Sequence, residues 1–546
     1  MDTKLNRDIL YSICSELFSE SCGGSAQNLR NLSLACRVLR DVSLPIIFSQ
    51  VKWPHPRKHT EEGGLEFFPP HLWPHFRSFT LDWPDHWPDS TPPLWGDRYY
   101  VGGDYHPRHL DKLVKAIPQM LALSSFHISC PFYPPTSIIS ALIQCPSIRE
   151  LSCHDTPLYA NMIPRVPAQF NLEKLAIVPV GEALRVGEGP YSAKYQEIYY
   201  YLRDYRKRFK NDSLAPYAAT AFLFSLGKSS HLRHIQISGE LCTLHDLAQQ
   251  DWPRLDTLIL TGHAPRPQGM VELVDVVAKM PKLRDIRLLF ASVKSDPSFR
   301  LLPIAHNNLT ARGTSACVLS QIRYLALSNA CHLRGVFQYT PFLERLVICA
   351  IIDLPKVPIA LGRAEVYNLL ADIAEAPSAP DINGGIRNHL KVLRIMIEDK
   401  ANPELYRNIC AQFPKLENLE VELCGYHDGK SIFPWSEFAD PFVALSKLRC
   451  LRICVQFPEF DDVDRGEPWK TARKQCAEYF ADRLSSLQRV GFEYRKRTGT
   501  HRYEDSWLEY DVGRRDDNGP RVEMHELPSS WYRFPEVWTP EFINSS

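Results

Sequence analysis

Two short stretches of the sequence bring together residue types that can perform covalent catalysis. They contain Cys153, His154 and Asp155 in "SCHDTPLY", and Cys424, His427 and Asp428 in "CGYHDG". A thiol beside an imidazole base can act as a nucleophile, but catalytic partners meet in space and not through adjacency along the chain. Both stretches follow an apolar pattern that predicts a strand. We therefore interpret them as loops at the edge of a repeated unit, not as catalytic sites.

Other patterns that support catalysis or metal binding are missing from the sequence. It has no Gly-x-Ser-x-Gly, Gly-x-x-x-x-Gly-Lys-Ser/Thr, His-Glu-x-x-His or glycine-rich dinucleotide motif. His55 with His59, and His71 with His75, form pairs four residues apart, yet no cysteine or carboxylate accompanies them at ligand spacing. We predict that the chain is not an enzyme and has no catalytic residue, no metal site and no cofactor.

Binding is the remaining kind of function, and two segments have unusual compositions. Residues 191–213 combine aromatic and basic side chains, which suit nucleic acid or an acidic peptide. A helix with a packed aromatic face and a solvated basic face is the favoured interpretation. Residues 53–107 are rich in tryptophan and proline. We expect them to form an ordered connector that caps the first repeat, in preference to a binding pocket.

A short apolar phrase recurs from about residue 70 onward. Its apolar-x-x-apolar-x-apolar pattern ends in a predicted strand with one buried face, and the segment before it often predicts a helix, as in "GMVELVDVVAKM". The 47-residue gap between Leu343 and Leu390 leaves room for one further copy. The copies are "HFRSFTL" at 75, "ALSSFHI" at 122, "CPSIRELSC" at 145, "NLEKLAI" at 171, "HLRHIQI" at 231, "WPRLDTLIL" at 252, "MPKLRDIRL" at 280, "QIRYLAL" at 321, "PFLERLVI" at 341, "HLKVLRI" at 389, "FPKLENLEV" at 413, "KLRCLRI" at 447 and "SLQRVGF" at 486.

A repeated unit of this kind cannot bury its apolar face alone, so the units must stack into a solenoid. The phrase and its spacing resemble a degenerate leucine-rich repeat. The resemblance implies an irregular α/β horseshoe over residues 111–495, with the segment 191–213 as an inserted helix. Alternating apolar residues on both sides of an Asp-Asn-Gly turn then predict a β-hairpin within a C-terminal cap at 496–546.

The strands of such a solenoid present an extended surface for binding. Residues between and just after the last two apolar positions of each phrase are expected to face outward. Their mixture of both charges with apolar residues favours a protein substrate over nucleic acid. The candidate substrate-binding residues are Arg287, Arg394, Met396, Glu420, Glu422, Arg452 and Glu493.

The first 50 residues predict two or three short amphipathic helices. Asn6 is a suitable N-cap, Gly23 and Gly24 break the pattern, and Pro45 ends the second helix or begins another turn. A unit this small usually needs a metal, a disulfide or a partner. The apolar stripes consist of Leu5, Ile9, Leu10, Ile13 and Leu17 in the first helix and of Leu29, Leu32, Cys36 and Leu39 in the second.

The pattern "LNRDILYSICSELF", followed by "LSLACRVLR" and "LPIIF", resembles an F-box. The resemblance implies that residues 1–50 are a helical domain that docks on a Skp-type adaptor and, through it, on a cullin of a ubiquitin ligase. Residues 51–110 would then be the connector and N-terminal cap, and the repeats would bind a protein substrate. Asn6 stands where the family usually has proline. The implied adaptor-binding residues are Leu5, Asn6, Ile9, Leu10, Ile13, Leu17, Leu32, Cys36 and Leu39.

Composition limits the partners and the compartment. Lys plus Arg (63) equals Asp plus Glu (63), so the net charge predicts neither a nucleic-acid nor a membrane partner. The N-terminus does not resemble a signal peptide, no apolar stretch is long enough to span a membrane, and the 15 cysteines are scattered. We expect an intracellular protein, cytoplasmic and/or nuclear.

Two functions remain open at this point. The first is the substrate-recognition subunit of a ubiquitin ligase. The alternative is a leucine-rich-repeat interaction scaffold that is not linked to ubiquitination and whose N-terminal helices cap the solenoid. The two differ in whether Ile9 and Ile13 contact a partner or the chain's own repeats.

Overall fold

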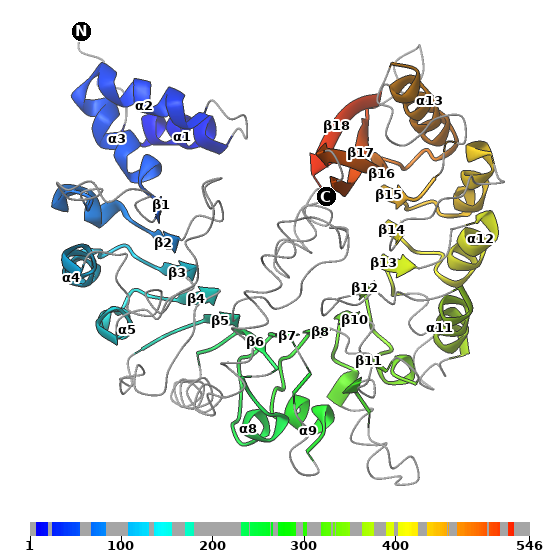
Figure 1. The fold of residues 1–546 in the computed structure, drawn as a ribbon, viewed down its shortest axis with the longest axis horizontal. Coiled ribbons are helices and arrows are strands. Elements are labelled where there is room, and N and C mark those ends of the chain that lie inside the picture. The colour runs from blue at the N-terminus through cyan, green and yellow to red at the C-terminus, as the bar shows by residue number, and fades with distance from the viewer. Residues whose placement is uncertain are drawn as a thin grey trace. The chain divides into compact units, whose positions relative to one another are not determined.

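The computed structural model has a mixed α/β fold built from two compact units (Figure 1). The first unit contains residues Met1–Val180 and Asp212–Ile237, and the second contains Gly181–Asn211 and Ser238–Ser546. The described residues are 7–19, 25–54, 67–82, 107–129, 136–154, 170–178, 231–239, 241–262, 264–265, 271–290, 299–302, 318–328, 331–332, 335–349, 363–375, 389–397, 402–423, 434–455, 457, 467–499, 502–513 and 522–528.

The first unit begins with three helices and continues into a parallel sheet. Its strands are paired in chain order, from β1 to β6. Figure 1 shows α4 and α5 on one side of these strands. Its elements are α1 (Arg7–Ser19), α2 (Ser25–Ala35), α3 (Arg37–Ile47), β1 (Gln50–Pro54), η1 (Pro70–His75), β2 (Ser78–Asp82), α4 (Pro107–Ala116), η3 (Ile117–Gln119), β3 (Ser125–Ser129), α5 (Thr136–Gln144), β4 (Glu150–His154), β5 (Lys174–Val178) and β6 (His234–Ser238).

The second unit contains the longer sheet, again with its main strands in chain order from β7 to β18. The strands are parallel up to β16, whereas β17 is antiparallel to both of its neighbours, β16 and β18. The helices α11, α12 and α13 lie on one side of it (Figure 1). Its elements are α8 (Leu244–Ala248), β7 (Thr257–Gly262), α9 (Leu273–Ala278), β8 (Asp285–Phe290), β9 (Phe299–Arg300), β10 (Tyr324–Ser328), β11 (Cys331–His332), η5 (Phe337–Tyr339), β12 (Arg345–Cys349), α11 (Arg363–Glu375), β13 (Val392–Ile397), α12 (Pro403–Gln412), β14 (Asn418–Leu423), η7 (Trp435–Phe438), η8 (Asp440–Ala444), β15 (Cys450–Ile453), α13 (Glu467–Arg483), β16 (Arg489–Gly499), β17 (Arg502–Val512) and β18 (Val522–Pro528).

Every copy of the apolar phrase becomes a strand of a sheet, from β2 for "HFRSFTL" to β16 for "SLQRVGF". The turn before each strand repeats one backbone contact. The carbonyl of Arg284, for example, accepts hydrogen bonds from the backbone N–H groups of Arg323 (2.8 Å) and Tyr324 (2.9 Å) in the next copy. The first apolar residue of a copy, such as Leu283, is completely buried beneath this turn. The phrase therefore encodes both a strand and the turn that sets its register.

Two expectations about the elements are wrong. No further strand is inserted in the sheet between β12 and β13, because these two strands pair directly, and α11 occupies part of the stretch between Leu343 and Leu390 that the structure describes. The stripe from Leu29 to Leu39 is not one helix either. Cys36 has extended backbone angles (φ −158°, ψ 164°) and separates α2 from α3, whereas Pro45 lies within the last turn of α3.

The C-terminal strands and the residues after α3 have regular structure. β17 and β18 form an antiparallel pair that closes at Val512 opposite Val522, where the sequence predicts a hairpin.

The tryptophan-rich connector is described in part, and there Trp53 and Phe67 pack edge to face, with ring centroids 5.1 Å apart. The expected helix at 191–213 lies outside the described residues.

Candidate functional site

The three N-terminal helices bury a small core of their own. Cys14 of α1, Leu29 of α2, and Val42 and Ile46 of α3 are at most 6% exposed, and Leu10, Leu32 and Ile47 pack against them. Cys14 is not a reactive thiol, because burial raises its pKa. This core is too small to use all the apolar side chains of the helices.

The remaining apolar side chains of these helices are exposed. Ile9 and Ile13 are 53% and 47% exposed, whereas Leu10 and Cys14, one position further along α1, face inward. At the end of α2 and the start of α3, Leu34 and Val38 are 84% and 51% exposed. We call Ile9, Tyr11, Ile13, Leu34 and Val38 the N-terminal apolar surface.

This arrangement divides the predicted adaptor-binding residues into three groups. Ile9, Ile13 and Cys36 are exposed, Leu10 and Leu32 pack on the core, and Leu39 is half-buried. Leu5, Asn6 and the side chain of Leu17 lie outside what the structure describes.

The prediction missed Leu34 and Val38. The apolar stripe of one continuous helix had assigned this face to Leu32, Cys36 and Leu39 instead. Helical spacing was the available signal, because Arg30 and Leu34 in "RNLSLACRVLR" are four residues apart and therefore share one face of α2.

The second candidate region is the sheet face opposite α11, α12 and α13 in the second unit. Phe492 of β16 points toward the helices, since its ring centroid lies 6.0 Å from that of Phe480 in α13. Gly491 therefore faces the opposite side, and parallel register places Arg452, Glu420 and Arg394 beside it in successive strands. Antiparallel register adds Glu509 of β17.

These side chains are joined by ion pairs across the strands. Arg394 Nη2 lies 2.9 Å from Glu420 Oε1, and Glu420 Oε2 lies 3.2 Å from Arg452 Nη1. Arg452 also donates through Nε to Glu509. Arg394, Glu420, Arg452 and Glu509, which we call the charged row, thus alternate in sign from β13 to β17.

We expected the candidate substrate-binding residues to be exposed, and this expectation is wrong for most of them. Glu420, Glu422 and Met396 are 0%, 2% and 3% exposed. Glu493 is half-buried and accepts a hydrogen bond from the backbone N–H of Leu423 at 3.0 Å. The three arginines, Arg287, Arg394 and Arg452, are 8–9% exposed. Sequence alternation located the face correctly but did not reveal that these charges are paired with one another. A role of these residues in substrate binding stays a prediction.

Burial and pairing act in opposite directions on the charged row. Burial lowers the pKa of Arg394 to about 10, although Glu420 and Glu422 favour its charged form. Burial also opposes the charge of Arg452, but Glu420 and Glu509 outweigh it and raise the pKa of Arg452. Both guanidinium groups therefore stay protonated at neutral pH.

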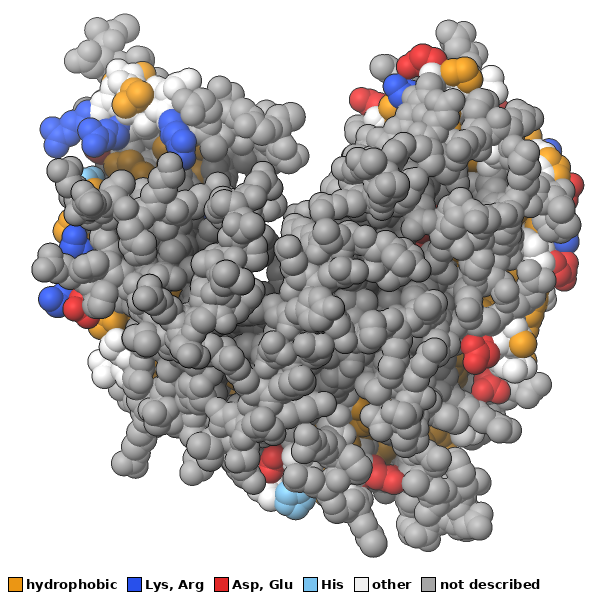
Figure 2. Space-filling model, in the orientation of Figure 1, with side chains coloured by type: hydrophobic (Ala, Val, Ile, Leu, Met, Phe, Trp, Pro, Cys, Tyr) orange, Lys and Arg blue, Asp and Glu red, His pale blue; other side chains and the backbone are white. Residues whose placement is uncertain are grey.

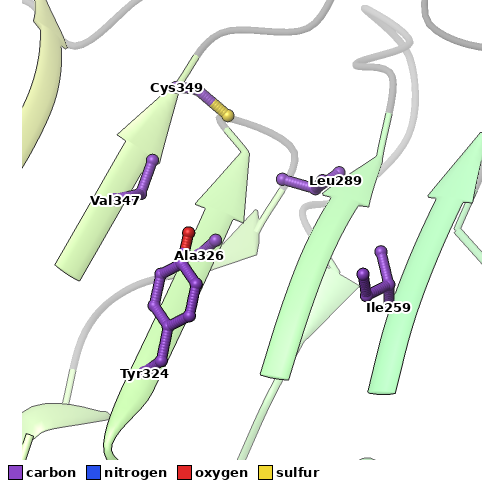
Figure 3. Close-up of a cluster of buried hydrophobic side chains, with 6 residues drawn as sticks. All are labelled: Ile259, Leu289, Tyr324, Ala326, Val347 and Cys349. Atoms are coloured by element: carbon purple, nitrogen blue, oxygen red, sulfur yellow. The ribbon is translucent and has the colours of Figure 1, made fainter. Parts of the chain in front are cut away.

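The same face becomes apolar toward β7. Ile259, Leu289, Tyr324, Ala326, Val347 and Cys349 form a buried cluster from four neighbouring strands (Figure 3). Arg287 lies within this row, with its guanidinium carbon 4.7 Å from the centroid of the Tyr324 ring and Nη2 2.7 Å from Asp285. The middle strands of the second unit are thus buried on both faces, as parallel strands commonly are.

The corresponding face of the first unit carries a polar network that the sequence interpretation missed. Ser125 donates to Glu150 (3.2 Å), and its oxygen lies 2.7 Å from Nε2 of His127, whose Nδ1 is 3.1 Å from the hydroxyl of Ser152. Glu150 also pairs with Lys174 at 2.8 Å. The signal was the polar alternation in "SSFHIS" and "ELSCH".

Residues that could support catalysis do not form a reactive site in the described residues. Burial raises the pKa of Cys153 to about 12, so its thiol stays protonated at neutral pH. The side chain of His154, and all of Asp155, Cys424, His427 and Asp428, lie outside the described part of the chain.

His71 and His75, which are four residues apart, both lie in η1. His71 is exposed, and the pKa of His75 is lowered by burial and by the charge of His71. Within the described ranges, no group of three or more His, Cys, Asp or Glu side chains could hold a metal ion. No helix there is long and apolar enough to cross a membrane.

Comparison with known proteins does not assign the chain to a family. No protein-family model matches the chain, and no curated protein matches it in sequence.

Proposed function

We propose that the chain is the substrate-recognition subunit of a cullin-RING ubiquitin ligase. In this proposal the N-terminal helices are an F-box that docks on a Skp-type adaptor, and the strands are a degenerate leucine-rich repeat that binds a protein substrate. The chain performs no covalent step. It contributes proximity, because tethering a substrate lysine near the ligase raises its effective concentration.

The N-terminal apolar surface is the observation that carries the proposal. The large hydrophobic side chains that are exposed in the described residues are Ile9, Tyr11, Ile13, Leu34, Val38, Leu121, Val443 and Met524. Five of these eight belong to α1, α2 and α3, although the helices are a small part of the chain. Such a concentration of exposed apolar side chains is typical of a protein interface.

A direct connection between the helices and the first sheet also supports the proposal. Only Phe48 and Ser49 separate α3 from β1, and the carbonyl of Ser49 accepts from the backbone N–H groups of Arg77 and Ser78. The Phe48 and Phe76 rings lie 6.4 Å apart. An adaptor bound to the helices would therefore be held in a fixed position relative to this sheet.

Co-purification of the full chain with a Skp-type adaptor tests the proposal. The test variant carries Ile9→Asp and Ile13→Asp, and the matched control carries Leu121→Asp and Val443→Asp, which alter two apolar side chains of similar exposure elsewhere. The wild type and the control should form a stoichiometric complex, and the test variant should not. Circular dichroism should show the same helix content for all three proteins.

Two results would contradict the receptor assignment. If the wild type forms no complex with the adaptor, the interaction scaffold that is not linked to ubiquitination becomes the better explanation. If the test variant binds as tightly as the wild type, the exposed side chains of α1 are not the docking surface.

A further inference from the structure

One row of side chains in the sheet of the first unit is formed mainly by polar residues. In β2 to β6 the alternate positions, such as Phe126 and Leu175, are apolar and completely buried. The positions between them face the other side of the sheet, and parallel register aligns one from each strand. We call these five residues the polar row: Thr80, His127, Ser152, Ala176 and Gln236.

The length of the polar row suits an extended peptide. Four steps between adjacent strands, each about 4.8 Å, separate Thr80 from Gln236, so the row is about 19 Å long. An extended peptide rises about 3.4 Å per residue, and a segment of about six residues therefore matches the row. Because such a segment would cross the strands, it could contact a side chain from each of them.

The row leads from partly exposed to buried surroundings. Thr80 and His127 are half-buried, Ser152 is 2% exposed and Gln236 is completely buried. Ala176 lies between Ser152 and Gln236, and its side chain ends at Cβ, so a ligand can approach the backbone there. A ligand along the row would therefore have its buried end at Gln236.

The amide of Gln236 is the observation that points to a ligand. Neither its Oε1 nor its Nε2 has a hydrogen-bond partner in the described part of the chain. By contrast, the hydroxyls of Ser125 and Ser152 both lie within hydrogen-bond distance of the His127 ring. A buried amide without partners costs free energy, and native proteins rarely contain one without a reason. A ligand with a donor beside an acceptor would satisfy both atoms.

We infer that the polar row binds an extended, uncharged segment of a protein, and that Gln236 forms hydrogen bonds with the backbone of this segment. In an extended chain, the N–H and C=O of one residue point to the same side, so a carboxamide can accept from one and donate to the other. The inference rests on the proposed function in calling this segment a substrate. It names the class of substrate and places the contact in the first unit, whereas the candidate substrate-binding residues all lie in the second.

The charges around the row favour an uncharged segment. Glu150 and Lys174 flank the row and lie 2.8 Å apart, so they offset each other. Figure 2 shows charged side chains of this unit on the side of α4 instead, where Asp111, Lys112 and Lys115 are exposed. Phosphorylated segments are bound by arginine clusters, and nucleic acids by basic stripes. The polar row has neither feature.

A substitution of Gln236 separates a role in binding from a role in folding. Methionine is similar in length and apolar, so Gln236→Met removes a buried amide without partners and should leave the urea midpoint unchanged or raise it. The same change should weaken peptide binding at least about tenfold, because two hydrogen bonds are lost. Gln412→Met is the matched control, since Gln412 also has a buried amide oxygen without a partner but lies at the end of α12 in the second unit.

The probes are three pools of random peptides of about eight residues with capped ends, long enough to cover the row. The first pool is built from Ala, Ser, Thr, Asn and Gln. The second also contains Asp, Glu and phosphoserine, and the third also contains Lys and Arg. Immobilised full chain selects from each pool, and mass spectrometry measures the enrichment. The wild type and Gln412→Met should enrich uncharged peptides at least about tenfold over charged ones, and Gln236→Met should not.

Several outcomes would overturn the inference. A lower urea midpoint for Gln236→Met would show that the amide is already bonded in the free chain. Equal selection by Gln236→Met and the wild type, or a loss of selection in Gln412→Met as well, would remove Gln236 from the contact. A preference of the wild type for charged peptides would assign the row to another ligand class, and no selection by the wild type would mean that the row binds no peptide.

Co-purification of the same proteins with a Skp-type adaptor distinguishes this inference from the proposed function. Gln236→Met leaves the N-terminal helices unchanged, so it should bind the adaptor as the wild type does. If the wild type binds the adaptor but selects no peptides, the inference fails and the proposed function stands. If the wild type selects uncharged peptides but does not bind the adaptor, the peptide site stands and the proposed function fails.

Discussion

Arg452 on β15 reaches across Gly491 on β16 to pair with Glu509 on β17. A Cβ atom at position 491 would lie 3.0 Å from Cγ of Arg452 and 3.3 Å from Cγ of Glu509. Both distances are shorter than ordinary carbon contacts, which begin near about 3.5 Å. Because residue 491 is a glycine, Arg452 and Glu509 can form a buried ion pair across the intervening strand β16.

The first prediction concerns this glycine. Gly491→Ala should destabilise the second unit by about 1–3 kcal/mol, because the added methyl group must displace Arg452, Glu509 or both. The urea midpoint of the full chain measures the loss. Gly491→Ala combined with Glu509→Gln should cost less than the sum of the single changes, since the methyl group then displaces a pair that is already broken. Strict additivity would contradict this explanation.

The second prediction concerns the centre of the charged row. Glu420 pairs with both Arg394 and Arg452 and is completely buried. Glu420→Gln should destabilise the protein by about 3–5 kcal/mol, because it leaves two buried guanidinium groups with fewer carboxylate partners. Glu404→Gln, which breaks an exposed pair with Arg407 on α12, should cost at most about 1 kcal/mol and serves as the control. Equal effects of the two substitutions would show that burial does not set the energy of these pairs.

The fold was more predictable from the sequence than the site was. The first apolar position of each copy, such as Leu283, has the same role, which is burial beneath the turn. Because this position recurs in a fixed local pattern, the periodicity of the sequence reveals its burial. The partner of a charged residue is not local. Arg452 and Glu509 are 57 residues apart, and nothing in either segment indicates the other. Whether Ile9 or the neighbouring Leu10 is exposed depends on how the three helices pack. The apolar pattern of α1 includes both residues, so the sequence alone cannot show that Leu10 faces inward and Ile9 does not.

The third prediction separates folding from docking on the N-terminal helices. Leu29 is completely buried in their core, so Leu29→Ala should destabilise them by about 2–5 kcal/mol. Ile9→Ala is exposed and should change stability by no more than about 0.5 kcal/mol. Hydrogen exchange of the amides in α1, α2 and α3 measures both effects. Faster exchange in Ile9→Ala, to the extent seen in Leu29→Ala, would mean that Ile9 belongs to the core.

The fourth prediction concerns the acid stability of the first unit. Burial raises the pKa of Glu150, but its hydrogen bond to Lys174 and the positive charges of Lys174 and His127 outweigh burial and hold the pKa below its ordinary value of 4.5. A carboxyl group whose pKa is lower in the folded chain than in the unfolded chain stabilises the fold. The full contribution is present at pH values above the unfolded pKa, and it is lost as the pH falls through the folded pKa. The urea midpoint of the wild type should therefore fall at pH values below 4.5. In Glu150→Gln this part of the pH dependence should be absent, and an unchanged pH profile would contradict the assignment.

The fifth prediction uses Cys36 as a reporter of the docking surface. Among the described cysteines Cys36 is the one that is exposed, and it lies between α2 and α3 beside Leu34. In the folded chain a maleimide should label Cys36 much faster than the buried Cys14, whose pKa is raised by burial. Saturating Skp-type adaptor should slow the labelling of Cys36 at least about tenfold, since an interface core excludes solvent. Mass spectrometry of the peptide that contains Cys36 measures the rate, and a Leu34→Ala variant should need more adaptor for the same protection. Labelling of Cys36 at an unchanged rate in a complex that co-purifies would place the adaptor on the Ile9 face of α1 alone and would remove the α2–α3 corner from the interface.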